Sequence, residues 1–228
     1  MNGMIATVNG GLQRDYWEKE HGFRCFDHPV VKFFAEQRLA FVNRFINLAQ
    51  VTSVLDVGCG SGFSSYYYGQ YVPEVWGVDR SETMLSQNPL PPEKLIQADV
   101  MDLPFERNTF NLVNSWEVLH HVENPHEALM EMYRVSKEFV VLFEPNRYNP
   151  ALIGLALIDR SHRWVLKYSM SFMKKLVEAA DLEIISSDVV GCIFPNKIPA
   201  SLLSVLKYVP FRIPLIGISN AVICRKRK

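Results

Sequence analysis

The stretch VLDVGCGSG at residues 54–62 decides the fold of this chain. It begins with aliphatic side chains that suit a short buried strand, and the glycine cluster that follows ends that strand. Glycine adopts positive φ and lets the backbone approach a ligand closely. Residues 63–71 then predict a helix, with Ser61 as its N-cap. A strand, a glycine turn and a helix N-terminus predict a ligand cradle in an open α/β sheet, although such strand ends also occur as simple tight turns.

Length and composition limit the class of protein. The chain has 228 residues, of which 48% are hydrophobic and 21% are charged, as in ordinary globular domains. The formal net charge is zero, so no bulk field favours nucleic acid. The cysteines are widely spaced and form no metal-binding or disulfide pattern: Cys25, Cys59, Cys192 and Cys224. We therefore expect one domain over residues 1–228, no metal, no nucleic-acid partner and a reducing cytoplasmic location.

The sequence predicts neither a leader nor a membrane span. The N-terminus has no early positive charge and no continuous apolar run. The longest clean apolar run, residues 151–158, is too short to cross a bilayer. Residues 198–224 are also apolar, but prolines and cations interrupt them. We expect no transmembrane segment, whereas peripheral contact with a membrane stays open.

Strand and helix patterns alternate through most of the chain. Strands are predicted at residues 52–57, 74–79, 94–98, 110–115, 139–143, 182–190 and 219–225, and helices at 63–71, 81–87, 125–134 and 169–180. This alternation predicts βαβ units and a mostly parallel sheet with right-handed crossovers. Before the first strand, residues 12–50 predict a helical cap with a short aromatic helix around Tyr16 and Trp17 and a longer helix that begins at Pro29.

Two long connections interrupt the alternation, at about residues 145–168 and 191–218. Long connections in compact domains are usually functional or disordered. Both segments are apolar and aromatic, so we expect ordered insertions that build or cover a substrate pocket.

The glycine spacing favours one class of ligand. Gly58, Gly60 and Gly62 form a G-x-G-x-G pattern, whereas a dinucleotide fingerprint needs a small residue at the position that Phe63 occupies. The pattern therefore favours a ligand that lacks a pyrophosphate.

Acidic residues follow the next two predicted strands. Asp79 can accept hydrogen bonds from both ribose hydroxyls, or it can be a helix N-cap. Asp99 can accept from an adenine amino group while the Val100 amide donates to the ring, or it can stabilise a turn.

At this point the chain resembles class I S-adenosylmethionine-dependent methyltransferases, over about residues 30–190. The resemblance is carried by VLDVGCGSG at 54–62, GVD at 77–79, ADVMDLPF at 98–105 and FNLVNSWEVLHHVENP at 110–125. The small-molecule branch that includes ubiquinone- and menaquinone-type methyltransferases is the most similar. The resemblance implies a three-layer α-β-α Rossmann-like fold with a seven-stranded sheet, order 3-2-1-4-5-7-6, whose seventh strand is antiparallel.

The resemblance also implies the cofactor, S-adenosyl-L-methionine, with S-adenosyl-L-homocysteine as the product. The residues that it places around this cofactor are Asp56, Gly58, Cys59 and Gly60 at the methionine moiety, Asp79 at the ribose, Asp99 and Val100 at the adenine, and Asn114, Ser115 and Trp116 on the sulfonium side.

The acceptor side is less specific, because methyl transfer mainly requires in-line alignment and needs a base only when the acceptor must lose a proton. His120 is the candidate base or substrate contact, whereas the family position of His121 favours packing. With Glu117 and Glu123 these histidines lack tetrahedral metal spacing. Glu144 can orient substrate or cap a loop.

The leading hypothesis is a methyltransferase that acts on a small, hydrophobic or aromatic, or lipid-like acceptor. The alternative is a non-catalytic methyltransferase-like subunit that binds the cofactor or a partner. A nicotinamide-dependent oxidoreductase is disfavoured by Phe63 and by the lack of a recognisable catalytic Tyr-Lys pair.

Overall fold

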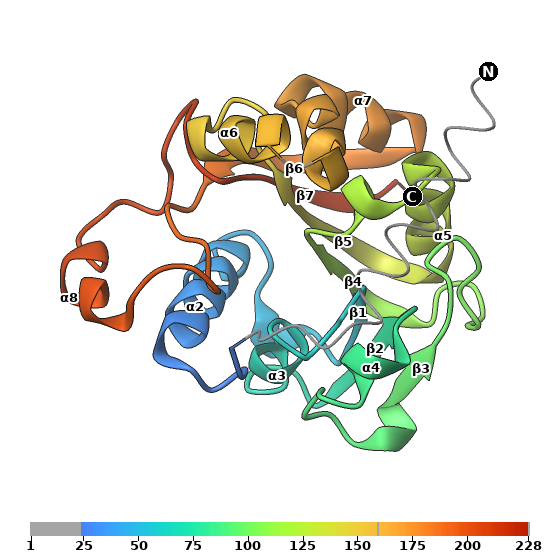
Figure 1. Cartoon of the computed structure of the whole chain (residues 1–228). Coiled ribbons are helices and arrows are strands. Elements are labelled where there is room, and N and C mark those ends of the chain that lie inside the picture. Colours follow the sequence, from blue (N-terminus) through green and yellow to red (C-terminus); the bar gives the residue numbers. More distant parts are fainter. Residues whose placement is uncertain (1–23, 159, 228) are drawn as a thin grey trace.

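The computed structural model describes residues 24–158 and 160–227 (Figure 1). Seven strands form one sheet in the order β3-β2-β1-β4-β5-β7-β6, and β7 is antiparallel to both of its neighbours. The strands are β1 (Ser53–Val57), β2 (Glu74–Asp79), β3 (Leu95–Gln97), β4 (Phe110–Trp116), β5 (Ser136–Pro145), β6 (Leu182–Val190) and β7 (Ser219–Lys226). The predicted sheet order and the antiparallel seventh strand are confirmed.

Helices cover both faces of the sheet. They are α2 (Pro29–Asn43), α3 (Ser65–Tyr68), α4 (Glu82–Leu85), α5 (Pro125–Val135), α6 (Pro150–Ile158), α7 (Met170–Ala179) and α8 (Leu203–Leu206). Figure 1 shows α2 and α3 on one side of the sheet and α5 and α7 on the other. Alternate residues of each strand therefore face different helices, and β1 illustrates this because Val54 packs towards α2 whereas Leu55 packs towards α5.

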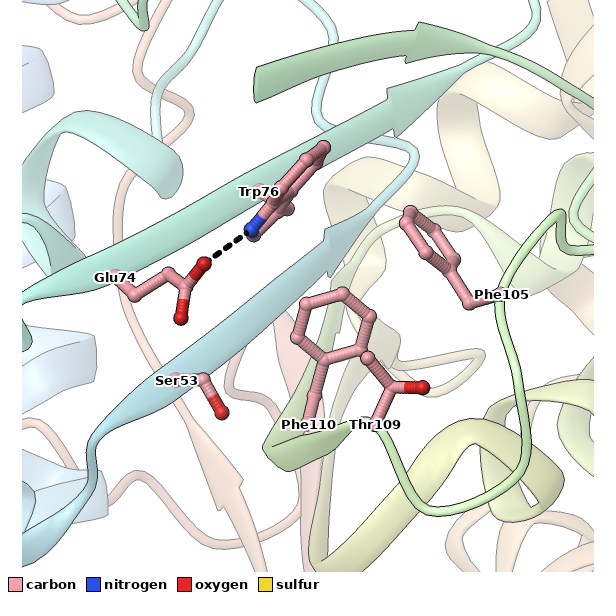
Figure 2. A pocket seen from close by; sticks show the side chains of 6 residues that line it. All are labelled: Ser53, Glu74, Trp76, Phe105, Thr109 and Phe110. Carbon is pink, nitrogen blue, oxygen red and sulfur yellow. Dashed lines mark hydrogen bonds between the residues drawn. The ribbon is translucent and has the colours of Figure 1, made fainter. Parts of the chain in front are cut away.

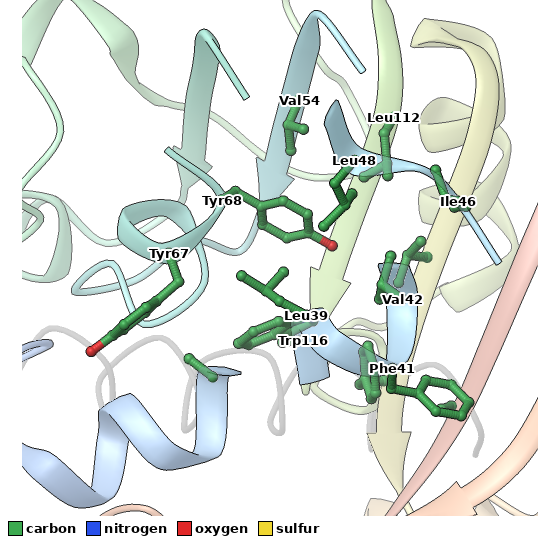
Figure 3. Close-up of a cluster of buried hydrophobic side chains, with 14 of the residues drawn as sticks. Leu39, Phe41, Val42, Ile46, Leu48, Val54, Tyr67, Tyr68, Leu112 and Trp116 are labelled. Carbon is green, nitrogen blue, oxygen red and sulfur yellow. The ribbon is translucent and has the colours of Figure 1, made fainter. Parts of the chain in front are cut away.

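The α2 side contains the more aromatic of the two cores. Figure 3 shows Leu39, Phe41 and Tyr68 packed together over the strands, with Trp116 at the end of β4. The predicted start of α2 is confirmed: Pro29 is its first residue, and the His28 ring accepts a hydrogen bond from the Val30 amide. Tyr16 and Trp17, and the beginning of the predicted cap, lie outside the described residues.

The helix predicted at residues 63–71 is shorter than expected, because the α-helix covers only Ser65–Tyr68. Its N-cap is Ser64, so the prediction of Ser61 was wrong. The physical reason is that Gly62 has φ of 90°, which keeps the backbone in the turn beyond Ser61. Ser81 is the N-cap of α4, since its Oγ accepts from the Met84 amide at 3.2 Å.

Both insertions are ordered in the described ranges. Residues 145–168 contain α6 and a 3-10 segment, Arg160–Lys167. Residues 191–218 contain α8 and extend beside α2, where the rings of Phe41 and Phe211 lie 5.7 Å apart. Among the described residues no helix has both the length and the apolar character needed to cross a membrane.

Candidate functional site

The residues predicted to bind a ligand meet at the carboxyl edge of the parallel strands. Val57, the last residue of β1, pairs with Val78 on one side and with Ser115 on the other. Asp79, the last residue of β2, pairs with Gln97 at the end of β3. The glycine turn, the two acids and the end of β4 therefore share one edge, which is where ligands bind in open α/β sheets.

The glycine turn is held by the protein itself. The amides of Gly58 and Cys59 both donate to the Val78 carbonyl, at 2.7 and 3.0 Å, and the Gly62 amide donates to the Cys59 carbonyl at 2.9 Å. Gly58 has φ of 70°, and a Cβ at this position would lie 2.3 Å from Val118 Cγ2. Because these amides are already engaged, the turn does not present them to a pyrophosphate, and this agrees with the ligand class that the sequence favours.

Asp56 lies beneath this turn. Its fully buried carboxylate accepts hydrogen bonds from the Ser64 hydroxyl at 2.5 Å, from the Ser65 hydroxyl at 2.6 Å and from the Asn114 amide at 2.8 Å. Burial raises the pKa of Asp56, and these hydrogen bonds oppose that rise. The Asn114 oxygen in turn accepts from the Tyr68 hydroxyl at 3.1 Å. The carboxylate thus ties β1, β4 and α3 together.

Cys59 also points into the protein, although its backbone is part of the turn. Its side chain is buried, and a Cβ on Gly77 would lie 2.7 Å from the Cys59 sulfur. Gly77 therefore leaves the space that the thiol fills. Burial raises the pKa of the Cys59 thiol well above its usual value, so this cysteine is packing rather than a nucleophile.

Asp79 connects the turn to the next helix. One carboxylate oxygen accepts from the Gly60 amide at 2.8 Å, and the other accepts from the Ser81 amide at 2.9 Å. Both oxygens of the Asp79 carboxylate thus act as hydrogen-bond acceptors at the end of β2. Asp99 follows β3 and accepts from the Met101 amide at 2.9 Å, which is the turn chemistry that the sequence left open beside a ligand role. Val100 is half-buried next to it.

Two polar atoms at the end of β4 are buried without a protein partner. Within the described ranges, neither Ser115 Oγ nor Trp116 Nε1 has a hydrogen-bond partner. Buried polar groups are normally satisfied, so such orphans at a ligand-binding edge fit a bound molecule. Together with the glycine turn and the Asp79 carboxylate, they fit a polar ligand that carries hydroxyl groups.

Glu144, at the end of β5, organises the segment after β4. Its fully buried carboxylate accepts from the amides of Val118 and Leu119 at 2.9 and 2.7 Å, and lies 2.8 Å from His120 Nδ1. An ionised carboxylate only accepts, so Nδ1 carries the proton and Nε2 is the nitrogen that can accept one. Glu144 therefore caps the loop after β4, as one of the two interpretations predicted. The same carboxylate also orients His120, the candidate base.

The two histidines differ in burial. His120 is buried and His121 is half-buried. Their rings lie 3.8 Å apart in a 3-10 turn, Leu119–His121, so adjacent residues face different surroundings. Glu144 contacts the ring of His120, which is the more buried of the two.

An ion pair that the sequence did not predict lies beside Trp116. Arg38 of α2 is buried and donates to Glu117 Oε1 at 2.5 Å and to the Ser219 hydroxyl at 2.7 Å. Its guanidinium lies 4.1 Å from the centre of the Phe34 ring. Burial lowers the pKa of Arg38, and the Glu117 carboxylate opposes this, so the pair keeps its charges together.

Glu117 has a strained backbone, with φ of 61°. Such a conformation is costly for a residue other than glycine and is found where the surroundings enforce it, often at functional sites. Here its amide donates to the Phe143 carbonyl at 2.6 Å, and the Ser219 hydroxyl donates to its carboxylate at 2.6 Å. Two features of the sequence could have indicated the Arg38–Glu117 ion pair. One is an acid directly after the β4 motif, and the other is an arginine on the apolar stripe of α2.

The cavity in Figure 2 is not this site. It has a volume of about 150 Å³ and is lined by residues that include Ser53, Glu74 and Phe110, which begin β1, β2 and β4. It therefore opens at the amino edge of the sheet, and it is smaller than the pockets of about 300 Å³ or more that hold cofactors. In the part of the chain that the structure describes, no group of three or more His, Cys, Asp or Glu side chains could hold a metal ion.

Comparison with known proteins gives a family for the central segment. Residues 55–142 match a family described as a methyltransferase domain. An uncharacterized methyltransferase of Schizosaccharomyces pombe is 37% identical over 99 residues, covering 37% of this chain and 36% of that protein. A ubiquinone biosynthesis O-methyltransferase of Hahella chejuensis is 26% identical over 193 residues, covering 76% of this chain and 78% of the relative.

A third relative and a solved structure complete the comparison. A demethylmenaquinone methyltransferase of Oceanobacillus iheyensis is 31% identical over 144 residues, which cover 58% of each protein. The aligned part of the chain thus spans from about a third to somewhat over three quarters of these relatives. A SAM-dependent methyltransferase structure from Archaeoglobus fulgidus has a TM-score of 0.62 at 19% identity, covering 86% of this chain and 94% of that one. The predicted fold and the resemblance to this class are confirmed.

Proposed function

We infer that this chain, which carries a methyltransferase domain on the class I S-adenosylmethionine-dependent methyltransferase fold, transfers a methyl group from S-adenosylmethionine to a small hydrophobic or aromatic acceptor. The observation that carries this inference is the bond from the Gly60 amide to Asp79 at the carboxyl edge. It joins a turn whose amides are engaged by protein to the carboxylate at the end of β2. This arrangement suits a nucleoside ligand without a pyrophosphate.

We assign the cofactor residues by what their atoms can do. The turn of Gly58 and Gly60, where the missing Cβ atoms let Val118 and Met84 pack closely, is assigned to the methionine end of the cofactor. Asp79 accepts from the ribose hydroxyls. Asp99 and Val100 stand at the adenine end. Asp56 and Cys59, which the resemblance placed at the methionine moiety, act from beneath the turn because their side chains are buried in protein contacts.

The end of β4 is assigned to the reacting side. The cofactor supplies a methyl group on a cationic sulfur, so surrounding groups mainly have to orient it and exclude water. Ser115 Oγ and Trp116 Nε1 are buried hydrogen-bonding atoms for this purpose. The Glu117 carboxylate follows directly, and Arg38 holds it in place, so Glu117 provides an oriented negative charge beside the cationic centre.

His120 is assigned as the proton acceptor. Glu144 holds its Nδ1–H, which leaves Nε2 to take the proton from an acceptor hydroxyl as the oxygen–methyl bond forms. The base is needed only for an acceptor that carries such a proton. A role for His120 as the base therefore implies an acceptor with a hydroxyl group.

The acceptor class is supported by the relatives and by the insertions. Two relatives are named for ubiquinone biosynthesis and for demethylmenaquinone, whose names indicate quinone-type ring acceptors. In this chain the insertions add apolar and aromatic side chains, and residues 145–168 adjoin the His120 turn through the bond from the Tyr168 hydroxyl to the Leu119 carbonyl, 2.6 Å long. We therefore propose a hydroxylated aromatic or quinol-type acceptor with an apolar substituent.

A labelled-methyl assay tests this proposal. The chain is incubated with S-adenosylmethionine labelled in the methyl group and with catechols that differ only in an alkyl tail. We expect label in the ring product, release of S-adenosylhomocysteine, and a higher kcat/KM for the acceptor with the tail. Turnover of none of these acceptors by a chain that binds S-adenosylhomocysteine would overturn the proposed acceptor class.

The role of His120 is tested in the same assay. His120→Ala should lower kcat by about 10²-fold or more and leave the affinity for S-adenosylhomocysteine unchanged, because loss of a general base affects only the proton step. The matched control is His126→Ala on the exposed side of α5, which should retain full activity. Full activity of His120→Ala would assign that ring to packing.

We also propose a single domain in a reducing, cytoplasmic setting. The described cysteines, Cys25, Cys59, Cys192 and Cys224, are all free thiols, which suits that compartment.

A further inference from the structure

We propose that α6 and the adjacent turn at Leu215 and Ile216 dock on an anionic lipid bilayer. We call this surface the apolar rim; it consists of exposed side chains of one helix and one turn, namely Tyr148, Ile153, Leu157, Ile158, Leu215 and Ile216. This docking proposal extends the proposed function. It rests on that function in one respect, the hydrophobic acceptor.

The first observation is the composition of α6. Its sequence, PALIGLALI, contains no polar side chain, and only Leu152 and Ala156 are buried. A surface helix of a globular protein normally has a polar face. Here Leu157 is 71% exposed and Ile158 is 88% exposed. Contiguous apolar patches on a surface mark interaction sites.

The second observation is that the turn is built to extend this face. The Asn146 side-chain amide donates to the carbonyls of Leu215 and Gly217 at 2.7 and 2.9 Å, and the Asn149 amide donates to the Ile216 carbonyl at 2.6 Å. Leu215 has φ of 69° and is 73% exposed. Packing in the core does not explain a leucine that is strained and held in solvent.

The third observation is the charge of the two insertions. Residues 145–168 contain four cations, Arg147, Arg160, Arg163 and Lys167, against one acid, Asp159, which gives 4 − 1 = +3. Residues 191–218 contain three cations, Lys197, Lys207 and Arg212, and no acid. Arg212 is paired with Asp188 of β6, so this segment contributes 3 − 1 = +2 in a chain of zero net charge. This excess complements an anionic lipid surface.

Aromatic rings accompany these cations. Lys167 Nζ lies 3.6 Å from the centre of the Trp164 ring, and the Arg147 guanidinium lies 5.5 Å from that of Tyr148. Aliphatic side chains beside tryptophan, tyrosine and cations are typical of segments that lie in a membrane interface. The combination favours a bilayer over a protein partner as the occupant.

The apolar rim is also connected to the reacting side. The Arg147 amide donates to the Tyr168 carbonyl at 3.1 Å, and the Tyr168 hydroxyl donates to the Leu119 carbonyl next to His120. A docked bilayer would therefore bring a membrane-dissolved acceptor to the side of the protein that holds the candidate base.

Vesicle flotation with the full chain tests the docking. Vesicles of phosphatidylcholine alone are compared with vesicles that also contain phosphatidylglycerol. We expect the chain to float with the anionic vesicles and to be released by raised salt. The double variant Leu157→Ser/Ile158→Ser should lower the vesicle partition coefficient about tenfold or more. The matched control, Tyr71→Ser/Met130→Ser, changes exposed apolar residues elsewhere and should float as the original chain does.

The possible outcomes separate the hypotheses. No flotation, or equal flotation of the Leu157/Ile158 variant and the original chain, overturns the proposal. Loss of a dimer in light scattering for that variant, without any vesicle binding, overturns it in favour of a second copy of the chain. S-adenosylhomocysteine affinity is measured on the same samples. Flotation without cofactor binding would refute the proposed function and leave the docking surface supported.

Discussion

At the scale of single residues, the site depends on carboxylates that hold protein amides and hydroxyls in place. Asp79 fixes the Gly60 amide, Glu144 caps the turn that carries His120, and Asp56 gathers two hydroxyls and an amide below the glycine turn. The positions of these acids could be predicted from the sequence because each follows or lies in a strand motif. Their partners could not, because each bond depends on side-chain directions that only the packed fold defines.

The buried Asp56 gives a pH-dependent stability with a defined sign. Its pKa is raised in the folded state, above the unfolded value of about 3.9, so the folded state binds more protons between the two values. Stability relative to Asp56→Asn should therefore fall as the pH rises through this interval and become constant above it. Urea unfolding of both proteins across this pH range measures the difference. If the original protein instead became more stable relative to Asp56→Asn as the pH rises, the hydrogen bonds would lower the pKa of Asp56 by more than burial raises it.

At the scale of secondary-structure elements, the glycine turn after β1 packs closely against β2 at Cys59 and Gly77. The sulfur of Cys59 occupies the space above Gly77, which explains the glycine in the GVD motif as a packing requirement. The existence of the strands could be predicted from alternating patterns, and their order in the sheet was implied by the family resemblance. The length of α3 could not, because Gly62 extends the turn through its positive φ.

This contact predicts a compensating pair of substitutions. Gly77→Ala should destabilise the protein by about 1–3 kcal/mol, because its Cβ would overlap the Cys59 sulfur. In Cys59→Ala the same change should cost less, with an interaction free energy of at least about 0.5 kcal/mol. Urea denaturation of the four proteins of the double-mutant cycle provides the values. Strict additivity would show that the thiol is not the obstacle.

The ion pair between Arg38 of α2 and Glu117 after β4 predicts a second pair of compensating substitutions. Arg38→Met should lower the free energy of unfolding by about 3 kcal/mol, the low end for a broken buried pair because Glu117 is partly exposed. Arg38→Met combined with Glu117→Gln should recover part of that loss, since it removes the unpaired charge. Thermal and urea unfolding report both values. The control Lys32→Met, in an exposed pair with Glu36, should change stability little. If the combined variant were less stable than Arg38→Met, charge would not be the cause.

At the scale of the whole molecule, the motifs at the ends of β1, β2, β3 and β4 predicted the ligand edge, and the family resemblance that they carry implied the sheet order. Parallel strands bring their carboxyl ends together whatever loops connect them, so the sequence predicts the shared edge well. The Arg38–Glu117 pair could not be predicted, because α2 precedes the sheet motifs and its direction across them is set by core packing. The contact between the two insertions, in which Asn146 donates to the Leu215 carbonyl, could not be predicted either, because it also depends on packing.

The most direct test is a calorimetric titration of the full chain with S-adenosylhomocysteine, repeated with Asp79→Ala and with the control Glu93→Ala on an exposed turn. We expect saturable one-site binding to the original chain and to the control. Asp79→Ala should bind more weakly by about 1.5–3 kcal/mol, the range for losing charge-assisted hydrogen bonds. Absence of binding to the original chain at millimolar ligand would contradict the assignment of this sheet edge as an S-adenosylmethionine site.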